Sequence, residues 1–486
     1  MLNSFFKVKE NNSSISTEIV AGITTFFAMS YILFINPQIL GQTGMPQPAV
    51  FLATIIASVI GTLVIGLFAN VPYALAPGMG LNAFFTYTVV LSLGFSWQQG
   101  LALVFFCGII NIIITVTKVR KMLINAIPLN LQFAISGGIG AFIAYAGLKN
   151  AGFLQFTSEN KDILSINGKA FKAAQKTFPG GIQSVVTGGG ITPALHSFNE
   201  APIVLALIGL IITVILLVKK VPASILLGIV ITALVGIPMG VTKLHFSSTF
   251  SLGSSFKSLG TTFLAAFSNK GMGSLFSNGN RIPLVLVTIL SFSLSDIFDS
   301  LGTFIGTGRQ TGIFSGKKEI ALEEAQGFKS KLDKALFADS IATGAGSIFG
   351  TSNLTTYVES SAGIGAGGRT GLTSVVVSVL FILSSLFSPL VAVIPSVATA
   401  PALIIVGIMM MQSFGKIDWK DISVAVPAFM TSLLMAFCYN ITYGIAAGFI
   451  FYCIINVVLH KTNKIHPLIW IVSILFVINF TVLALI

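Results

Sequence analysis

Long apolar runs alternate with short polar connections along almost the whole chain. Since a helix needs roughly 20 apolar residues to cross a bilayer, the pattern predicts about fourteen membrane-spanning segments, seven in each half. In the first half the runs are residues 19–40, 50–69, 71–91, 98–116, 129–148, 202–218 and 221–239. In the second half they are residues 283–307, 336–349, 348–371, 373–394, 398–411, 422–438 and 441–459. We therefore expect an all-α polytopic membrane protein.

The third segment of each half is interrupted by small residues. Residues 72–84 read PYALAPGMGLNAF, and residues 348–371 read IFGTSNLTTYVESSAGIGAGGRTG. Irregular backbone at membrane depth is tolerated only where it is buried in protein or lines a cavity. An odd number of spans per half makes the second half inverted relative to the first. Paired interruptions in an inverted repeat point to the binding site of a transporter, near the bilayer midplane.

Composition supports the membrane assignment. Of the 486 residues, 54% are hydrophobic and 9% are charged, whereas soluble domains carry about 25% charged residues. The net charge of +12 would favour a nucleic-acid partner in a soluble protein, but we assign the Lys and Arg residues to cytoplasmic loops, which carry an excess of them. The three Cys and four His residues are scattered without metal-ligand spacing, so we expect no metal and no cofactor.

The positive charges predict the orientation. If residues 1–18 form a cytoplasmic tail, the inner loops carry positive residues beside the span ends, where the positive-inside rule is most informative: Lys118, Arg120, Lys121, Lys219, Lys220, Arg309, Lys317, Lys318, Arg369, Lys416, Lys420, Lys461 and Lys464. We expect a multi-pass protein of the cell membrane, with a first repeat at 19–240, an extracellular loop at 241–281, a second repeat at 282–460 and a hydrophobic segment at 461–486. Whether residues 467–486 span the membrane stays open.

Four acidic residues lie in or near spans of the second half: Asp296, Asp299, Asp339 and Glu359. A charge at the bilayer centre costs about 2.5 to 3.5 kcal/mol on insertion scales, so each acid needs a cavity, a partner or a proton. Asp296 and Asp299 share a helix face, and two close carboxylates resist ionising together, which predicts that one holds a proton near neutral pH. The alternative is that one of them only hydrogen-bonds a neighbouring helix. For Asp339 we expect a structural or gating hydrogen bond.

Glu359 is the candidate ligand-binding residue of the tenth segment. A half-helix that starts here would aim free N–H groups at a cavity, and the carboxylate would accept hydrogen bonds from ring N–H groups. The alternative is a structural cap. Asn82 would face Glu359 from the other repeat, with Gly78 and Gly80 allowing the backbone to approach a ligand closely. An Asn that only satisfies the backbone of the broken helix is equally compatible.

Four motifs resemble one known family. Residues 18–32 (EIVAGITTFFAMSYI), 76–85 (APGMGLNAFF), 296–303 (DIFDSLGT) and 351–364 (TSNLTTYVESSAGI) look like the azaguanine-like branch of the nucleobase:cation symporter-2 permeases. The resemblance runs from about residue 5 to the last span. It implies two inverted repeats of seven spans, a core and a gate domain, and short antiparallel strands in the third and tenth segments.

The resemblance also implies proton-coupled uptake of purine bases, namely hypoxanthine, guanine and adenine. By motif, Asp299 and Glu359 match the acids of the eighth and tenth spans that bind the base, and Asn82 matches the binding position of the third span. The expected substrate-binding set is Glu359, Asp299, Asn82, Gly80, Thr356, Val358 and Phe298, and the expected proton-coupling set is Asp299, Asp296 and Glu359. A base would stack on Phe26, Tyr31 or Phe298. Ser360, where the uracil and xanthine branch has Asn, argues against xanthine, uric acid and uracil.

Three classes of function compete. A proton and purine-base symporter that moves its core against its gate like an elevator uses both acids. An anion exchanger or channel on the same inverted-repeat fold would need a basic or neutral site instead. An intramembrane aspartyl protease needs two Asp residues on two helices, whereas Asp296 and Asp299 lie on one, so we expect no enzyme. The purine preference, the coupling ion and a homodimer stay open.

Overall fold

The computed structural model describes residues 2–117, 127–157, 163–166, 169–170, 185–187, 192–244, 252–304, 313–314 and 330–485. Within these ranges, seven helices are long and apolar enough to cross a membrane, and six shorter apolar helices accompany them. The expected all-α polytopic membrane architecture is confirmed, while the number of spans stays a prediction. The predicted inner residues Lys118, Arg120, Lys121, Arg309, Lys317 and Lys318 lie outside the described ranges.

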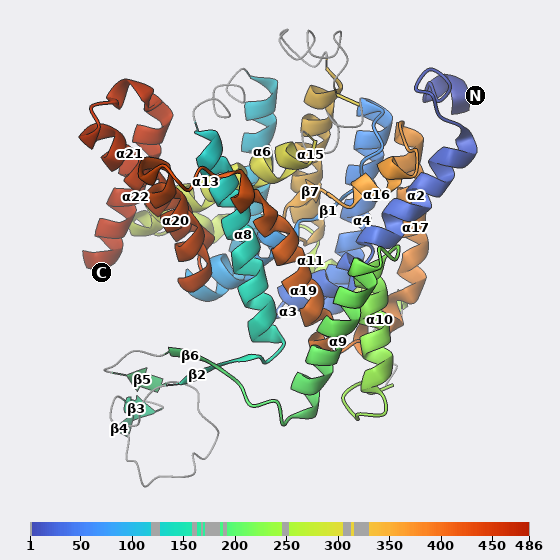
Figure 1. Ribbon diagram of the computed structural model, residues 1–486, viewed down its shortest axis with the longest axis horizontal. Helices are drawn as coiled ribbons and strands as arrows, with labels where there is room; N and C mark the ends of the chain where they lie inside the picture. Colours follow the sequence, from blue (N-terminus) through green and yellow to red (C-terminus); the bar gives the residue numbers. More distant parts are fainter. Residues whose placement is uncertain are drawn as a thin grey trace.

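The helices and strands follow the predicted rhythm (Figure 1). The first half contains α2 (Ile15–Met29), α3 (Ile32–Gly41), α4 (Gln47–Val64), η1 (Ile65–Ala69), β1 (Leu75–Pro77), α5 (Met79–Ala83), η2 (Phe84–Ser92), α6 (Trp97–Val116), α8 (Leu129–Asn150), α9 (Ala201–Val218) and α10 (Ser224–Gly236). The second half contains α13 (Ile282–Thr303), α15 (Lys331–Phe349), β7 (Leu354–Thr356), α16 (Ser360–Gly365), α17 (Gly371–Ser384), α19 (Ser396–Met411), α20 (Ile422–Phe437), α21 (Ile441–Val458) and α22 (Pro467–Leu485).

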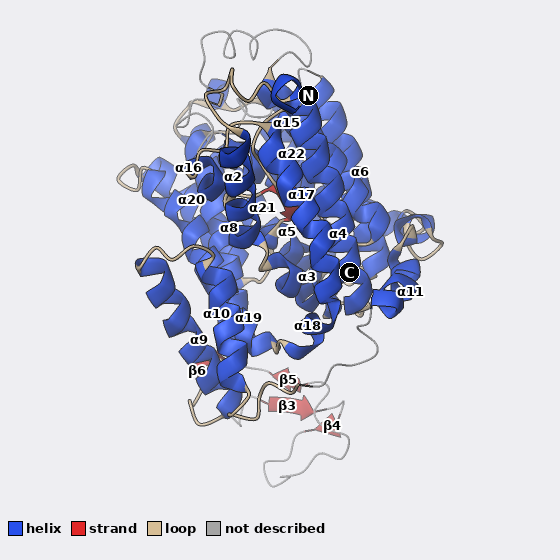
Figure 2. Ribbon diagram, turned by 90° about the vertical axis from the view of Figure 1, so that its right-hand side faces the viewer, coloured by secondary structure: helices blue, strands red, loops and turns tan. Residues whose placement is uncertain are grey.

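The two interrupted segments meet through their strands. β1 and β7 pair antiparallel, with Leu75 opposite Thr356 and Pro77 opposite Leu354. All residues of both strands are buried, and the pair lies in the middle of the helices (Figures 1 and 2). A side chain at Gly78 would meet the Thr355 hydroxyl at 2.6 Å, so glycine allows the two chains to approach closely here.

The first predicted span, residues 19–40, consists of two helices rather than one. α2 ends at Met29 and α3 begins at Ile32. At the junction the backbone N–H groups of Leu33 and Phe34 bond to Ser30 and Tyr31, three residues back, which tightens the turn. This junction places Tyr31 near the strand pair.

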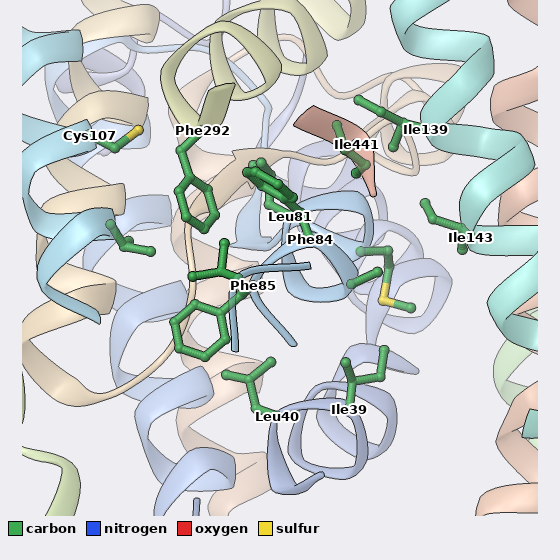
Figure 3. Packing of buried hydrophobic residues seen from close by; sticks show 14 of the residues in the cluster. Ile39, Leu40, Leu81, Phe84, Phe85, Cys107, Ile139, Ile143, Phe292 and Ile441 are labelled. Carbon is green, nitrogen blue, oxygen red and sulfur yellow. The ribbon is translucent and has the colours of Figure 1, made fainter. Parts of the chain in front are cut away.

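The helices form two groups around the strand pair. α8 packs against α19, α20 and α21, while α15 packs against α4 and α6, and α17 against α2 and α4. Glycines allow close packing within the first group, since a side chain at Gly140 would meet the Gly407 carbonyl oxygen at 2.7 Å. Figure 3 shows Leu81 and Phe84 between Phe292 on one side and Ile139 and Ile143 of α8 on the other. The strand pair and α5 therefore belong to one group and border the other.

The last hydrophobic segment forms a helix. α22 packs along α21 and α13, and the rings of Phe480 and Tyr443 lie 5.5 Å apart. Ile469, Val472 and Phe476 are buried in this contact. The segment is therefore part of the helical body, and whether it crosses the membrane stays open.

Candidate functional site

Two carboxylates from different helices reach the β1–β7 crossing. Asp299 lies in the last turn and a half of α13, next to Thr355 of β7. Glu359 lies at the start of α16, and the two carboxylates are close enough to interact electrostatically. Both side chains are half-buried, whereas the adjacent strand β7 is buried. We call Asp299 and Glu359 the open pair.

Tyr31 holds the Glu359 carboxylate from the broken first span. Its hydroxyl donates to Glu359 Oε1 at 2.5 Å, and the tyrosine is 1% exposed. The Glu359 side chain makes no capping hydrogen bond to α16, so the structural alternative considered for this residue finds no support. The sequence suggests Tyr31 as a ring on which a base would stack, and the structure adds its hydrogen bond to Glu359.

A second set of polar residues surrounds Asp296, one turn before Asp299. Asp296 is 0% exposed, and its Oδ2 accepts hydrogen bonds from Asn111 at 2.8 Å, Thr343 at 3.1 Å and Asn353 at 3.4 Å. Asp296 Oδ1 and Asn353 Oδ1 have no hydrogen-bond partner within the described part of the chain. We call Asp296, Asn111, Thr343 and Asn353 the sealed cluster, since all four are buried.

Asp339 of α15 ties three elements together. Its Oδ1 accepts hydrogen bonds from Ser300 of α13 at 2.8 Å and from Thr356 of β7 at 2.9 Å, and the Thr356 N–H donates to Ser300. These are structural bonds of the kind expected for Asp339. In the described ranges none of the four acids forms an ion pair with Lys or Arg.

Asn82 and Gly80 lie on α5, directly after β1. Asn82 is 0% exposed and accepts a hydrogen bond from Ser352 of the other repeat. A side chain at Gly80 would meet Ile139 of α8 at 2.5 Å. In this structure, therefore, Asn82 joins the two interrupted segments and Gly80 borders α8.

The remaining candidates are dispersed around the open pair. Thr356 is bonded to Asp339, as described, and Val358 is 47% exposed next to Glu359. The Phe298 side chain lies outside what the structure describes. Phe26 is buried against Phe381, at 5.3 Å between ring centroids. The structure thus brings Asp299, Glu359, Val358 and Thr356 to one place.

Asn111 and Asn353 are polar residues near the site that the sequence did not single out. Asn111 is the one amide side chain in the apolar stretch 100–116, and isolated polar residues in a span mark functional or packing contacts. That signal was available for Asn111. Its partner, Asp296 on α13, lies 185 positions away, so the contact itself required the fold.

Comparison with known sequences places this arrangement among permeases. The sequence pattern of the Permease family matches residues 16–186 and 180–447. The adenine permease AdeP of Escherichia coli is 38% identical over 480 residues, 99% of this chain and 96% of AdeP. The guanine/hypoxanthine permease PbuO of Bacillus subtilis is 40% identical over 482 residues, 98% of this chain and 100% of PbuO. The nucleobase transporter PlAzg2 of Paenibacillus larvae is 33% identical, over 90% of this chain and 76% of PlAzg2.

Solved structures share the fold at low sequence identity. The transmembrane domain of the cyanobacterial bicarbonate transporter BicA superposes with a TM-score of 0.55 at 15% identity, covering 89% of this chain and 97% of that domain. The murine anion transporter Slc26a9, in its inward-facing state, superposes with a TM-score of 0.56 at 15% identity, covering 92% of this chain and 69% of that one. The likeness identifies the inverted-repeat fold and says nothing about the transported molecule.

Proposed function

The chain belongs to the nucleobase:cation symporter-2 permeases, and from that premise we propose that it imports purine nucleobases together with protons. It is a multi-pass membrane protein, and in this proposal it resides in the cell membrane with its N-terminus in the cytoplasm. The substrates are hypoxanthine, guanine and adenine. The observation that carries the proposal is the open pair, two half-buried carboxylates that form no ion pair with a Lys or Arg of the described ranges.

The open pair suits a neutral planar ring that carries N–H groups. Ionised carboxylates only accept hydrogen bonds, and a purine base presents N–H donors on more than one edge. Asp299 and Glu359 come from different elements, so the two acids could accept from two edges of one ring. Tyr31 donates to Glu359, which orients this carboxylate before the base arrives.

An anion is the less suitable cargo. Two acids that pair with no Lys or Arg in the part of the chain that the structure describes repel a negative charge, and this repulsion is strong where water is scarce. The fold shared with BicA and Slc26a9 does not change this argument, because one fold hosts many functions and the site decides. We therefore do not propose anion exchange for this chain.

The sealed cluster is the proposed proton site. A fully buried carboxylate with no cation is costly as an anion, and such groups instead bind a proton. The unpartnered Oδ1 of Asp296 offers a place for it. Asp296 and Asp299 lie one turn apart on α13, so a proton on the first and a purine on the second would be coupled through a single helix.

The proposed motion is of the elevator type. The strand pair, α5, α13 and α16 would move together as the core, against a gate built on α8, α19, α20 and α21. Inverted-repeat transporters alternate access largely by rigid-body movement of one bundle against the other. The β1–β7 pairing and the bonds of Asp339 would keep both halves of the site in the same moving body.

Uptake measurements test the proposal. The chain is expressed in cells that lack purine permeases, and entry of radiolabelled hypoxanthine, guanine and adenine is followed with and without a protonophore. We expect saturable uptake that the protonophore abolishes. Purified protein in liposomes should accumulate the base when a pH gradient is imposed and not when a Na⁺ gradient is imposed. Absence of uptake for all three bases would reject the substrate, and uptake driven by Na⁺ alone would reject the proton.

A further inference from the structure

The break in the first span gives the open pair a third participant. Tyr31 lies between the end of α2 and the start of α3, 328 positions from Glu359 in the sequence. Its phenol is buried, so the hydroxyl exchanges little with water, and it donates to Oε1 of the carboxylate at 2.5 Å. α16 packs against α2, so the tyrosine and the acid belong to the same group of helices and stay together as that group moves.

A neighbouring tyrosine, Tyr357, directs its hydroxyl to a different acceptor. The rings of Tyr31 and Tyr357 lie 6.4 Å apart, and both tyrosines are buried. The Tyr357 hydroxyl donates to the carbonyl oxygen of Pro77 at 2.7 Å and so supports strand β1. Of the two phenols, the one from the first span therefore serves the carboxylate.

We propose that Tyr31 is a positioning residue that sets the preference among purine bases, an inference that rests on the proposed function. By bonding to Oε1, its hydroxyl fixes the Glu359 carboxylate and takes one acceptor site of that oxygen, so Oε2 is the freer acceptor for an N–H group of the base. The bond orients the Glu359 carboxylate and uses one of its acceptor sites. Tyr31 thereby favours bases that offer Glu359 a single donor.

Guanine and hypoxanthine differ in the relevant group. Both carry a ring N–H at position 1, and guanine adds a 2-amino N–H directly beside it. A carboxylate with both oxygens available binds two parallel N–H donors together, as it does with the arginine fork. With one acceptor site of Oε1 taken by Tyr31, the second donor of guanine must compete with the phenol for that oxygen.

Direct binding to purified protein tests the proposal, with Tyr31→Phe compared with the matched variant Tyr357→Phe. Loss of the charge-assisted bond in Tyr31→Phe should weaken hypoxanthine binding about tenfold. Guanine binding should change by less than about threefold, because its 2-amino group replaces the tyrosine as the donor to Oε1. Tyr357→Phe should lower the unfolding temperature and leave the ratio of the two dissociation constants unchanged. p-Aminophenylalanine in place of Tyr31 restores a donor of the same shape and should restore the wild-type ratio.

The outcomes separate the two proposals. Wild-type protein that binds neither base would overturn the proposed substrate and the role of Tyr31 with it. Wild-type binding combined with equal losses for both bases in Tyr31→Phe, or with no loss, would overturn the role of Tyr31 alone. If Tyr31→Phe does not fold, the p-aminophenylalanine protein provides the test. A wild-type ratio of the hypoxanthine and guanine dissociation constants supports the proposal, and a shifted ratio contradicts it.

Discussion

The two interrupted segments repeat one design and differ in charge. In each, a buried three-residue strand leads into a short helix, and the strands pair with each other. After β1 the first half offers the amide of Asn82, whereas after β7 the second half offers the carboxylate of Glu359. The other acids near the crossing, Asp296, Asp299 and Asp339, also come from the second half. The first half thus contributes neutral hydrogen bonds to the crossing, and the second half contributes the acids that we propose bind a base and a proton.

A physical reason favours this division. An amide buried between the repeats can be satisfied by neutral neighbours, as Asn82 accepts from Ser352 and donates to the carbonyl oxygen of Pro77 at 3.5 Å. A carboxylate in the same place loses far more hydration energy, so each added acid needs a ligand, a proton or several donors. Because these acids all lie in the second half, the lost hydration energy is confined to the region that we propose binds the base and the proton. The following experiments test this division between the two halves.

The largest effect is expected from the open pair. Glu359→Ala and Asp299→Ala should each reduce purine uptake by about a hundredfold or more, because each removes a charged acceptor that the base needs in a water-poor site. Uptake is measured alongside the amount of protein in the membrane, with Glu200→Ala, an exposed acid, as the control. Near-normal uptake in either variant would remove that residue from the site.

The second-largest effect is expected from Asp296→Asn, which should uncouple transport from the proton gradient. The amide keeps the size of the side chain and cannot take up and release a proton, so accumulation against a gradient should be lost while the dissociation constant for hypoxanthine changes by less than about threefold. Liposomes with an imposed pH gradient provide the measurement. Proton-driven accumulation at the wild-type level would place the proton elsewhere.

Asp339 should affect stability more than transport. Asp339→Leu leaves the buried hydroxyls of Ser300 and Thr356 without their acceptor, at a cost of about 1–3 kcal/mol for each. Asp339→Asn retains an oxygen acceptor and should cost less. Unfolding of the purified variants in detergent would show the order, and a leucine variant as stable as wild type would contradict the structural role.

The smallest effect concerns Gly80 in the neutral half. Gly80→Ala places a methyl group against Ile139 of α8, at a contact between the two helix groups. We expect uptake to slow by about threefold to tenfold through overpacking of about 1 kcal/mol, and Ile139→Ala in the same protein should restore it. If Gly80 instead borders the base, affinity will fall in Gly80→Ala and the second substitution will not restore it.

Much of the architecture follows from the sequence alone. The apolar runs identify a membrane protein because the bilayer requires every buried backbone group to be bonded internally. The two interruptions, the four acids and the family motifs are local features, and they pointed to Asp299 and Glu359 before any coordinates were considered. The β1–β7 pairing agrees with what the family motifs imply.

Only the tertiary structure showed which polar groups meet. Tyr31 contacts Glu359 across 328 positions, Asn111 contacts Asp296 across 185, and Ser352 contacts Asn82 across 270. Hydropathy patterns report which face of a helix is apolar, and they carry no information about which distant helix lies opposite. For the same reason the sequence identified four acids of one kind. Only the packing separated a half-buried pair, for which we propose contact with a base, from a fully buried aspartate and from one held by structural hydrogen bonds.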